Sequence, residues 1–138
     1  MSLNDEERRT IVSLELEKAH NTFEEIEILV NASRWSGAAS RLYYAVFHAV
    51  NALLINDAHI VNTHKGSHAI FIFYYIKTGI IATEYGRLYN TLQTLREKSD
   101  YNCVYVVTRE EIYEAIEPAR NLLSIIESYI VNSHHTDR

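Results

Sequence analysis

Apolar positions recur along this chain at alternating steps of three and four residues, the spacing of one face of an α-helix. The first such pattern predicts a helix over residues 5–31, with apolar positions at Val12, Leu16, Ala19, Phe23, Ile26 and Val30. Asn4 is the expected N-cap, and Glu7 stands where a capping box needs a glutamate. The opposite face is rich in glutamate, including Glu15 and Glu25, and is expected to be solvated.

A second helix is predicted over residues 33–57, with Ser33 as its N-cap, and it is apolar on nearly every side. Such a helix belongs at the centre of a bundle. Its polar residues follow one another at steps of three and four and so form a single line: Arg41, Tyr44, His48 and Asn51. Because burying a lone charge is costly, these side chains either bind carboxylates and carbonyls inside the bundle or line a binding site.

Two further helices are predicted in the next part of the chain. A short one covers residues 66–78 and ends at Gly79, which suits a left-handed backbone conformation. A longer one covers residues 83–100. Residues 101–108 are rich in β-branched and aromatic side chains, but a lone strand has nothing to pair with, so an extended connector is expected.

The last helix is expected to begin after Thr108, which forms a capping box with Glu111. Pro118 lies inside this helix and is expected to kink it, and residues 134–138 are expected to be a frayed tail. Only four glycines and one proline occur in 138 residues, which favours long helices. The prediction is one all-α domain over residues 1–138, an up-and-down antiparallel four-helix bundle with an extra short helix.

The net charge and the cysteine content indicate which binding surfaces and which cellular compartment to expect. The formal net charge of −5 argues against a surface that binds nucleic acid or membrane all over, although a local basic patch is compatible with it. The single cysteine, Cys103, excludes an internal disulfide, favours a reducing compartment and is expected to be a small buried residue. No apolar run approaches the ~18 residues of a membrane span, and no signal peptide is expected. We therefore expect a cytoplasmic protein with no membrane partner.

Two groups of residues could recognise phosphate. On the central helix, Arg41 and His48 could line a phosphate-binding groove, because the guanidinium fork fits phosphate oxygens. Near the end of the following long helix, Arg96 could bind a phosphate while Tyr101 stacks on a base. Arg96 and Asp100 are also four residues apart, the spacing of a local surface ion pair.

Histidine content gives a weaker indication of chemistry. His64 and His68 have the spacing of two zinc ligands on a helix, but His64 is expected to precede the helix. No cysteine, aspartate or glutamate lies near them in the sequence, so no metal site is expected. The chain also lacks a Ser-His-Asp pattern, a glycine-rich phosphate loop and a CxxC motif, and no cofactor is expected.

Three segments resemble the prokaryotic HEPN-domain family. The first is Ser40–Ala49, which resembles the family's second helix, and the next is Lys65–His68 with the following residues 71–79. The third is Leu95–Tyr101, which is similar to the family's Arg-x-x-x-Asp-Tyr segment. The resemblance spans about residues 10–131. It implies a helical bundle that usually forms a homodimer, and a minimal nucleotidyltransferase as partner, as in toxin–antitoxin pairs.

Many HEPN proteins are metal-independent ribonucleases, whose site is an arginine followed, after four to six residues, by a histidine, with one copy of this pair from each protomer at the dimer interface. Here Arg96 is present, but the corresponding positions hold Tyr101, Asn102 and Cys103. A phenol with a pKa of about 10 does not supply acid–base chemistry near neutral pH, as histidine does. Glu97 follows the arginine and would repel phosphate. We therefore expect a dimer that binds nucleotide or RNA without strong catalysis.

The residues expected to bind this ligand are Arg41, Tyr44, His48, Arg96, Asp100 and Tyr101. Two alternatives stay open. The chain could be an active toxin-like ribonuclease in which Tyr101 or His48 assists Arg96. It could also be a purely structural dimerisation module whose polar residues are internal ties. The ligand-binding interpretation requires that side chains from two separate helices converge.

Overall fold

The structure is a computed structural model that describes the backbone of residues 3–136 and the side chains of residues 3–134. Its elements are α1 (Asp5–Asn31), α2 (Trp35–Asn56), α3 (His64–Phe71), the π-helical turn η1 (Ile72–Ile76), α4 (Thr83–Tyr101) and α5 (Arg109–Thr136). Within residues 3–136 no strand is present. The predicted all-α bundle of four long helices and one short helix is therefore confirmed. None of the helices in this range combines the length and apolar character that a membrane crossing would require.

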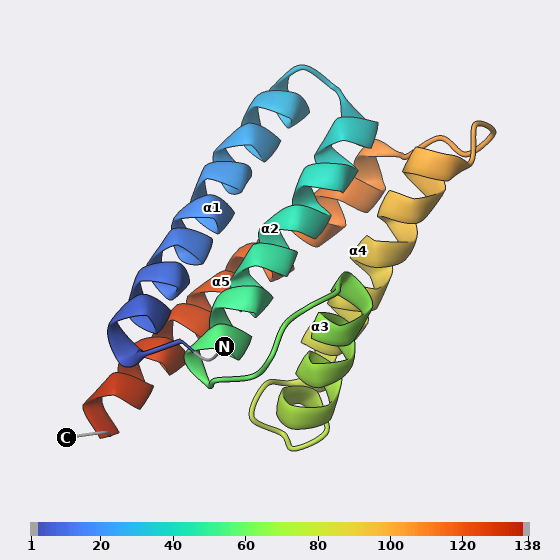
Figure 1. Ribbon diagram of the computed structural model, residues 1–138. Helices are drawn as coiled ribbons and strands as arrows, with labels where there is room; N and C mark the ends of the chain where they lie inside the picture. Colours follow the sequence, from blue (N-terminus) through green and yellow to red (C-terminus); the bar gives the residue numbers. More distant parts are fainter. Residues whose placement is uncertain (1–2, 137–138) are drawn as a thin grey trace.

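Helix α2 lies at the centre of the bundle, as its nearly continuous apolar surface predicts. It contacts α1, α3, α4 and α5, and Figure 1 shows these helices arranged around it. Leu42, Leu53 and Leu54 are completely buried, and each contributes about 1.5–3 kcal/mol relative to an exposed position. Small side chains along the same helix let its neighbours approach closely: Ala38, Ala39, Ala45, Ala49 and Ala52.

Two predicted capping boxes are confirmed. At the start of α1, the Glu7 backbone N–H donates to the Asn4 side chain at 2.8 Å, and the Asn4 N–H donates to the Glu7 carboxylate at 3.0 Å. At the start of α5, the Glu111 N–H donates to the Thr108 hydroxyl at 3.2 Å, and the Thr108 N–H donates back at 2.9 Å. Each pair satisfies two backbone donors that a helix start would leave free.

The expectation that Ser33 caps α2 is wrong. Ser33 has a φ of +57° and belongs instead to the end of α1. The N–H of Arg34 donates to the carbonyl of Leu29 at 2.8 Å, the bond of a Schellman ending in which the left-handed residue closes the helix. Ala58 has a φ of +65° and plays the same part after α2. The tight α1–α2 connection therefore uses the serine for its backbone conformation, and its hydroxyl caps nothing.

The short helical segment differs from its prediction in two ways. Helix α3 begins at His64 and not at Gly66, because the Thr63 hydroxyl accepts the Gly66 N–H at 2.9 Å and caps it. The segment then widens into the π-helical turn η1. Gly79 has a φ of +81°, which confirms the predicted left-handed ending.

The wide turn η1 packs closely against α4. A Cβ added to Gly86 would lie 3.2 Å from the side chain of Ile76 and 3.3 Å from that of Ile72. A π turn holds one residue more than an α turn and so spreads its side chains over a wider arc. Glycine at this point of α4 leaves room for the two isoleucines.

Asp57 ties the end of α2 to two other elements. The hydroxyls of Tyr75 on η1 and Tyr129 on α5 both donate to its Oδ2, each at 2.6 Å. Burial, together with these bonds to a carboxylate, raises the pKa of Tyr75, and it raises that of Tyr129 to about 12. Both phenols are therefore donors across the physiological pH range.

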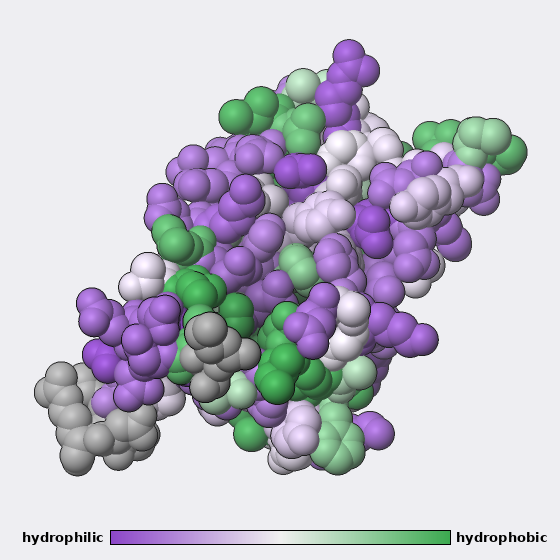
Figure 2. Space-filling model, in the orientation of Figure 1, coloured by the Kyte–Doolittle hydropathy of each residue, from purple (hydrophilic) through white to green (hydrophobic). Residues whose placement is uncertain are grey.

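Residues 102–108 form the predicted connector without helix or strand, one residue shorter than expected because Tyr101 still belongs to α4. Figure 1 shows part of it as a loop that protrudes beyond the bundle. The tip is apolar in Figure 2, with Val104 and Val106 exposed. The expectation that Cys103 is buried is wrong, because the loop reaches into solvent. Helix α5 continues through Pro118, and the kink stays a prediction. The tail expected to fray is still helical to residue 136, and residues 137–138 lie outside the described range.

Candidate functional site

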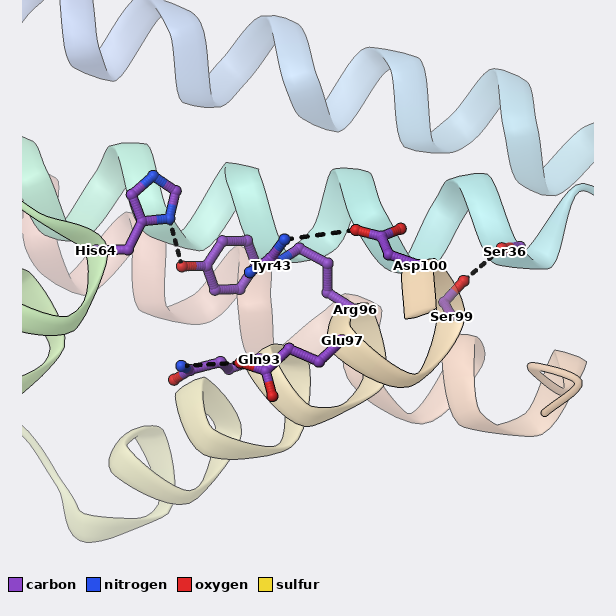
Figure 3. Close-up of polar contacts among 8 residues, drawn as sticks. All are labelled: Ser36, Tyr43, His64, Gln93, Arg96, Glu97, Ser99 and Asp100. Carbon is purple, nitrogen blue, oxygen red and sulfur yellow. Dashed lines mark hydrogen bonds and ion pairs between the residues drawn. The ribbon is translucent and has the colours of Figure 1, made fainter. Parts of the chain in front are cut away.

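Arg96 of α4 lies against two aromatic side chains of α2. Its guanidinium carbon is 4.5 Å from the ring centre of Tyr43 and 5.8 Å from that of Tyr44, and Figure 3 shows it over the Tyr43 ring. Contacts of this kind contribute about 0.5–2 kcal/mol, more when they are shielded from water. The Arg96 side chain is only 15% exposed. The two tyrosines therefore hold the guanidinium in place.

Most hydrogen-bond donors of Arg96 remain unused. Its Nη1 lies 3.4 Å from Oδ2 of Asp100, which is the local pair that the sequence spacing allows. Its Nε is buried and has no hydrogen-bond partner among the residues that the structure describes. A guanidinium has five N–H donors, so a single long contact leaves this group with capacity for an anionic ligand.

Arg41, which lies on α2 itself, also contacts the ring of Tyr44. Its guanidinium carbon lies 5.6 Å from the ring centre of Tyr44, so Arg41 and Arg96 both contact one ring. Arg41 also pairs with Glu25 of α1 at 3.4 Å, with 40% and 53% of the two side chains exposed. A pair this exposed contributes little to stability. The Arg41 guanidinium is therefore weakly held by its carboxylate and open to exchange of partners.

His48 is bound more firmly than Arg41. Its Nδ1 lies 3.0 Å from the Glu15 carboxylate, with side-chain exposures of 18% and 25%, and its ring centre lies 6.5 Å from that of Tyr44. The expectation that the glutamate face of α1 is solvated is therefore wrong for Glu15, whereas Glu25 is exposed as expected, although it pairs with Arg41. Both carboxylates pair with the polar line of α2, as the structural interpretation of that line requires.

His64, at the first position of α3, is the residue that sequence reasoning missed. Its ring stacks on Phe47 with centres 4.1 Å apart, and its Nδ1 lies 3.0 Å from the Tyr43 hydroxyl. Burial lowers the pKa of His64, and the positive charges of Arg96 and His48 lower it further. The imidazole is therefore neutral near pH 7. Two signals could have found it: the capping threonine before it, and the aromatic pair at positions 43 and 47 beside the polar line.

The partner of this histidine is itself uncharged. Burial raises the pKa of Tyr43, an effect that the positive charge of Arg96 opposes. The Tyr43–His64 contact is thus a hydrogen bond between a phenol and a neutral imidazole. Because Tyr43 is 1% exposed, its ring is fixed by the core, and it fixes the imidazole in turn.

The structure brings most of the predicted site residues together. We call the group the Arg96 cluster, which consists of Arg41, Tyr43, Tyr44, His48, His64, Arg96 and Asp100. Tyr101 is not part of it. Tyr101 is 80% exposed at the end of α4, so its ring lies in solvent and not against the cluster. Its suggested role stays a prediction.

Two further residues, Asn51 and Glu97, form no hydrogen bond with the Arg96 cluster in the described part of the chain. Asn51, the last of the polar line, is buried, and its Oδ1 has no hydrogen-bond partner in the described part of the chain. Glu97, expected to repel phosphate, extends along α4 to Gln93, whose side chain donates to it at 3.4 Å (Figure 3). Its negative charge still reaches the site, because it contributes to the raised pKa of Tyr43, the ring that Arg96 contacts.

Metal ligation has no support among the described residues, which contain no group of three or more His, Cys, Asp or Glu side chains able to hold an ion. His68 does not share a site with His64. It stacks on Tyr89 with ring centres 4.6 Å apart. The two histidines therefore contact different tyrosine rings, His64 that of Tyr43 and His68 that of Tyr89, and these two rings lie 6.1 Å apart.

A groove of about 470 Å³ separates α4 from α5. Its apolar floor includes Leu88, Leu95 and Ala115, and Glu84, Glu111 and Glu114 also line it. Carboxylates disfavour a polyanion, so the Arg96 cluster is the better candidate for a phosphate ligand.

Comparison with known proteins gives a consistent result. Residues 12–129 match the family described as the HEPN domain. The chain is 33% identical over 116 residues to "Putative toxin MJ0605" of Methanocaldococcus jannaschii, covering 82% of this chain and 86% of that protein. It is 29% identical over 124 residues to a "UPF0332 protein" of Thermotoga maritima, covering 90% and 94%. A second M. jannaschii protein, "Putative toxin MJ0142", is 27% identical over 119 residues, covering 86% and 81%.

Proposed function

Since this chain belongs to the HEPN-domain family, we propose that it is a toxin-type HEPN protein that binds RNA through the Arg96 cluster. It acts in this proposal as a cytoplasmic homodimer, together with a nucleotidyltransferase-like partner. The names of two relatives support the toxin-type role. Nucleotides carry the same phosphate and base groups, so they are expected to compete for the cluster.

One observation carries the RNA-binding proposal. Arg41 and Arg96 reach the ring of Tyr44 from two different helices, at 5.6 and 5.8 Å. Arginine side chains beside a partly exposed aromatic ring form the combination that binds single-stranded nucleic acid, because the cations bind phosphate and the ring stacks on a base. In a protein of net charge −5, a polyanion is expected to compete at these two guanidinium groups with Glu25 and Asp100, each of which lies 3.4 Å from its arginine.

The test is the binding of a fluorescein-labelled single-stranded RNA, followed by fluorescence anisotropy at low and moderate salt. Loss of one phosphate contact and its aromatic support is expected to weaken binding by about ten-fold or more in Arg96→Ala. Arg87→Ala is the matched control, because Arg87 is exposed on the same helix about two and a half turns earlier and therefore points the other way. Equal affinity of the two variants would contradict the proposal.

The proposed assembly is tested separately. Sedimentation at micromolar concentration is expected to show a species of twice 16.0 kDa. Expression of the chain alone is expected to slow growth, and expression together with the product of the neighbouring gene is expected to restore it. A monomer in sedimentation would remove the dimer, and unchanged growth would remove the toxin-type role.

The ion pairs between α1 and α2 favour a second candidate, a purely structural module. In this candidate Glu15–His48 and Glu25–Arg41 are ties that hold the two helices together. Loss of one partner from such a pair would lower the free energy of unfolding and would not change the affinity for any ligand. Arg41→Ala with a lower melting temperature and no measurable RNA binding in the parent protein would favour this candidate.

A further inference from the structure

The groove between α4 and α5 has no part in the proposed RNA binding. Its larger hollow, of about 470 Å³, has Leu88 and Leu95 in its floor. A second hollow of about 330 Å³ continues it toward Lys98 and Tyr105, and Leu95 lines both. None of the described residues that line either hollow belongs to the Arg96 cluster. The groove is therefore a separate feature of the surface.

The length and the floor of this groove fit a helix. From Glu84 to Lys98 the groove follows α4 for about 20 Å, at about 1.5 Å per residue. The side chains in its floor, among them Leu88 and Ala115, are apolar. An apolar floor between two helices is the setting in which the apolar stripe of a third, amphipathic helix docks. The groove has room for about four turns of such a helix.

The rim of the groove is negatively charged. Glu84 and Glu114 are exposed, and Glu111 is half-buried. The Tyr105 hydroxyl donates to the Glu111 carboxylate and lowers its pKa, an effect that burial opposes, so this group is ionised at neutral pH. Among the described residues that line the larger hollow, these three carboxylates accompany one guanidinium, that of Arg87. A ligand with several positive charges is complementary to this rim.

Pro118 adds a hydrogen-bond acceptor to the same rim. Proline has no N–H, so Pro118 cannot donate to the carbonyl of Glu114, which is four residues earlier in α5. Pro118 and Glu114 both line the groove. The carbonyl of Glu114 thus lacks its usual helical donor beside the Glu114 carboxylate. Guanidinium and ammonium groups only donate, so they match this combination of acceptors.

We infer that the α4–α5 groove is the docking surface for an amphipathic helix of a partner protein. The apolar stripe of that helix lies on Leu88, Leu95 and Ala115, and its arginine or lysine side chains contact the carboxylates of the rim and the Glu114 carbonyl. A second copy of this chain is a poorer match, because its net charge is −5. The inference does not depend on RNA binding, since the two sites share no residue.

The experiment measures the binding of a synthetic peptide to the intact protein. The probe is a fluorescein-labelled helical peptide of about 16 residues with leucines along one face and arginines beside them. Fluorescence anisotropy is expected to show saturable binding that weakens as salt is raised. Glutamate in place of the arginines, or serine in place of the leucines, is expected to lower the affinity by about ten-fold or more.

A charge reversal in the protein locates the binding site. Glu114→Lys is expected to lower the affinity for the arginine peptide by about ten-fold. Glu117→Lys is the matched control, because Glu117 is exposed on the same helix, lies outside both hollows and gives the same change in net charge. Its affinity is expected to stay within about two-fold of the parental value.

Pro118→Ala tests the free carbonyl. The alanine N–H can bond to the Glu114 carbonyl, so the melting temperature is expected to rise while the affinity for the peptide falls by about three-fold or more. Because this variant is expected to be more stable than the parent, unfolding does not account for such a loss. Unchanged affinity would contradict the role of the carbonyl.

The remaining outcomes separate the possible occupants of the groove. If the arginine peptide does not bind, or binds Glu114→Lys and the parent equally, the docking proposal is refuted. If no peptide binds and Glu114→Lys alters the sedimentation of the protein alone, the groove is a contact between copies of this chain, and the partner helix is likewise refuted. Neither result affects the RNA-binding proposal, which is tested with Arg96→Ala.

Discussion

The guanidinium carbon of Arg96 lies 4.5 Å from the ring centre of Tyr43. The two residues belong to different helices, α4 and α2, so this contact joins the elements that present the candidate site. The tyrosine ring is 1% exposed and belongs to the hydrophobic core. Core packing therefore fixes the position of Arg96 before a ligand binds. Ligand binding then does not incur the entropy cost of ordering a free arginine side chain.

Asp100→Asn is expected to strengthen RNA binding. The Asp100 carboxylate lies 3.4 Å from Nη1 of Arg96 and competes with phosphate for that donor. The amide is similar in size, lacks the charge and removes repulsion of the polyanion, so affinity is expected to rise by about three- to ten-fold at low salt. Anisotropy titrations measure it, with Asp5→Asn as an exposed control on α1. A lower affinity in Asp100→Asn would show that the carboxylate orients Arg96.

Acid sensitivity near neutral pH is expected to depend on His68. Burial lowers the pKa of this residue below 6.5, so between the folded and unfolded pKa values the unfolded chain binds more protons. Unfolding free energy therefore falls as the pH drops through that window. His68→Phe keeps an aromatic ring against Tyr89 and cannot titrate.

The melting temperature of His68→Phe is thus expected to fall less than that of the parent between about pH 7.5 and about pH 5.5. His20→Gln serves as the control and is expected to keep the parental loss. Parallel curves for His68→Phe and the parent would show that burial of this imidazole does not contribute to acid destabilisation.

Ala58→Gly is expected to stabilise the protein. Ala58 has a φ of +65° after the end of α2, a conformation that costs an L-residue about 1 kcal/mol and glycine almost nothing. Urea denaturation is expected to show a gain of about 0.5–1 kcal/mol. Ala69→Gly, at an exposed position inside α3, is expected to lose a similar amount. Destabilisation by both substitutions would refute the role of the left-handed conformation.

Tyr129→Phe is expected to destabilise the bundle through Asp57. The hydroxyl donates to the Asp57 carboxylate at 2.6 Å, and a bond to a charged acceptor contributes about 1.5–3 kcal/mol. Because Tyr75 donates to the same oxygen, the double variant is expected to lose more than the sum of the two single variants. Urea denaturation of the four proteins gives this comparison, and strict additivity would show that the two bonds are independent.

The sequence predicted the helices well wherever local chemistry decides them. Periodic apolar positions located the four long helices, and two capping boxes fixed the starts of α1 and α5. The predictions of helix boundaries were wrong where one residue could take either of two local roles. Ser33 can cap a helix start or close a helix end, and the short α1–α2 connection selects the second. The π turn η1 has no local signature, since it depends on packing against Gly86.

The arrangement of the candidate site was predicted in part, for a similar reason. The spacing along α2 predicted that Arg41, Tyr44 and His48 share one helix face, and the structure shows them on that face. Their role as a ligand site stays a prediction. The contribution of His64 depends on how α3 docks against the neighbouring face of α2, where Tyr43 and Phe47 look like ordinary core residues in the sequence. Spacing within a helix can predict which residues share a face, but it cannot predict which face meets a distant segment.

Gly86 has a consequence that reaches the other end of α4. Its contact with the wide turn η1 fixes the N-terminal part of α4, and Arg96 lies about 15 Å further along this helix. A larger side chain at position 86 would tilt α4 and move the Arg96 guanidinium out of alignment with α2. A substitution in η1 that alters this contact would therefore shift Arg96, although η1 does not contact the Arg96 cluster.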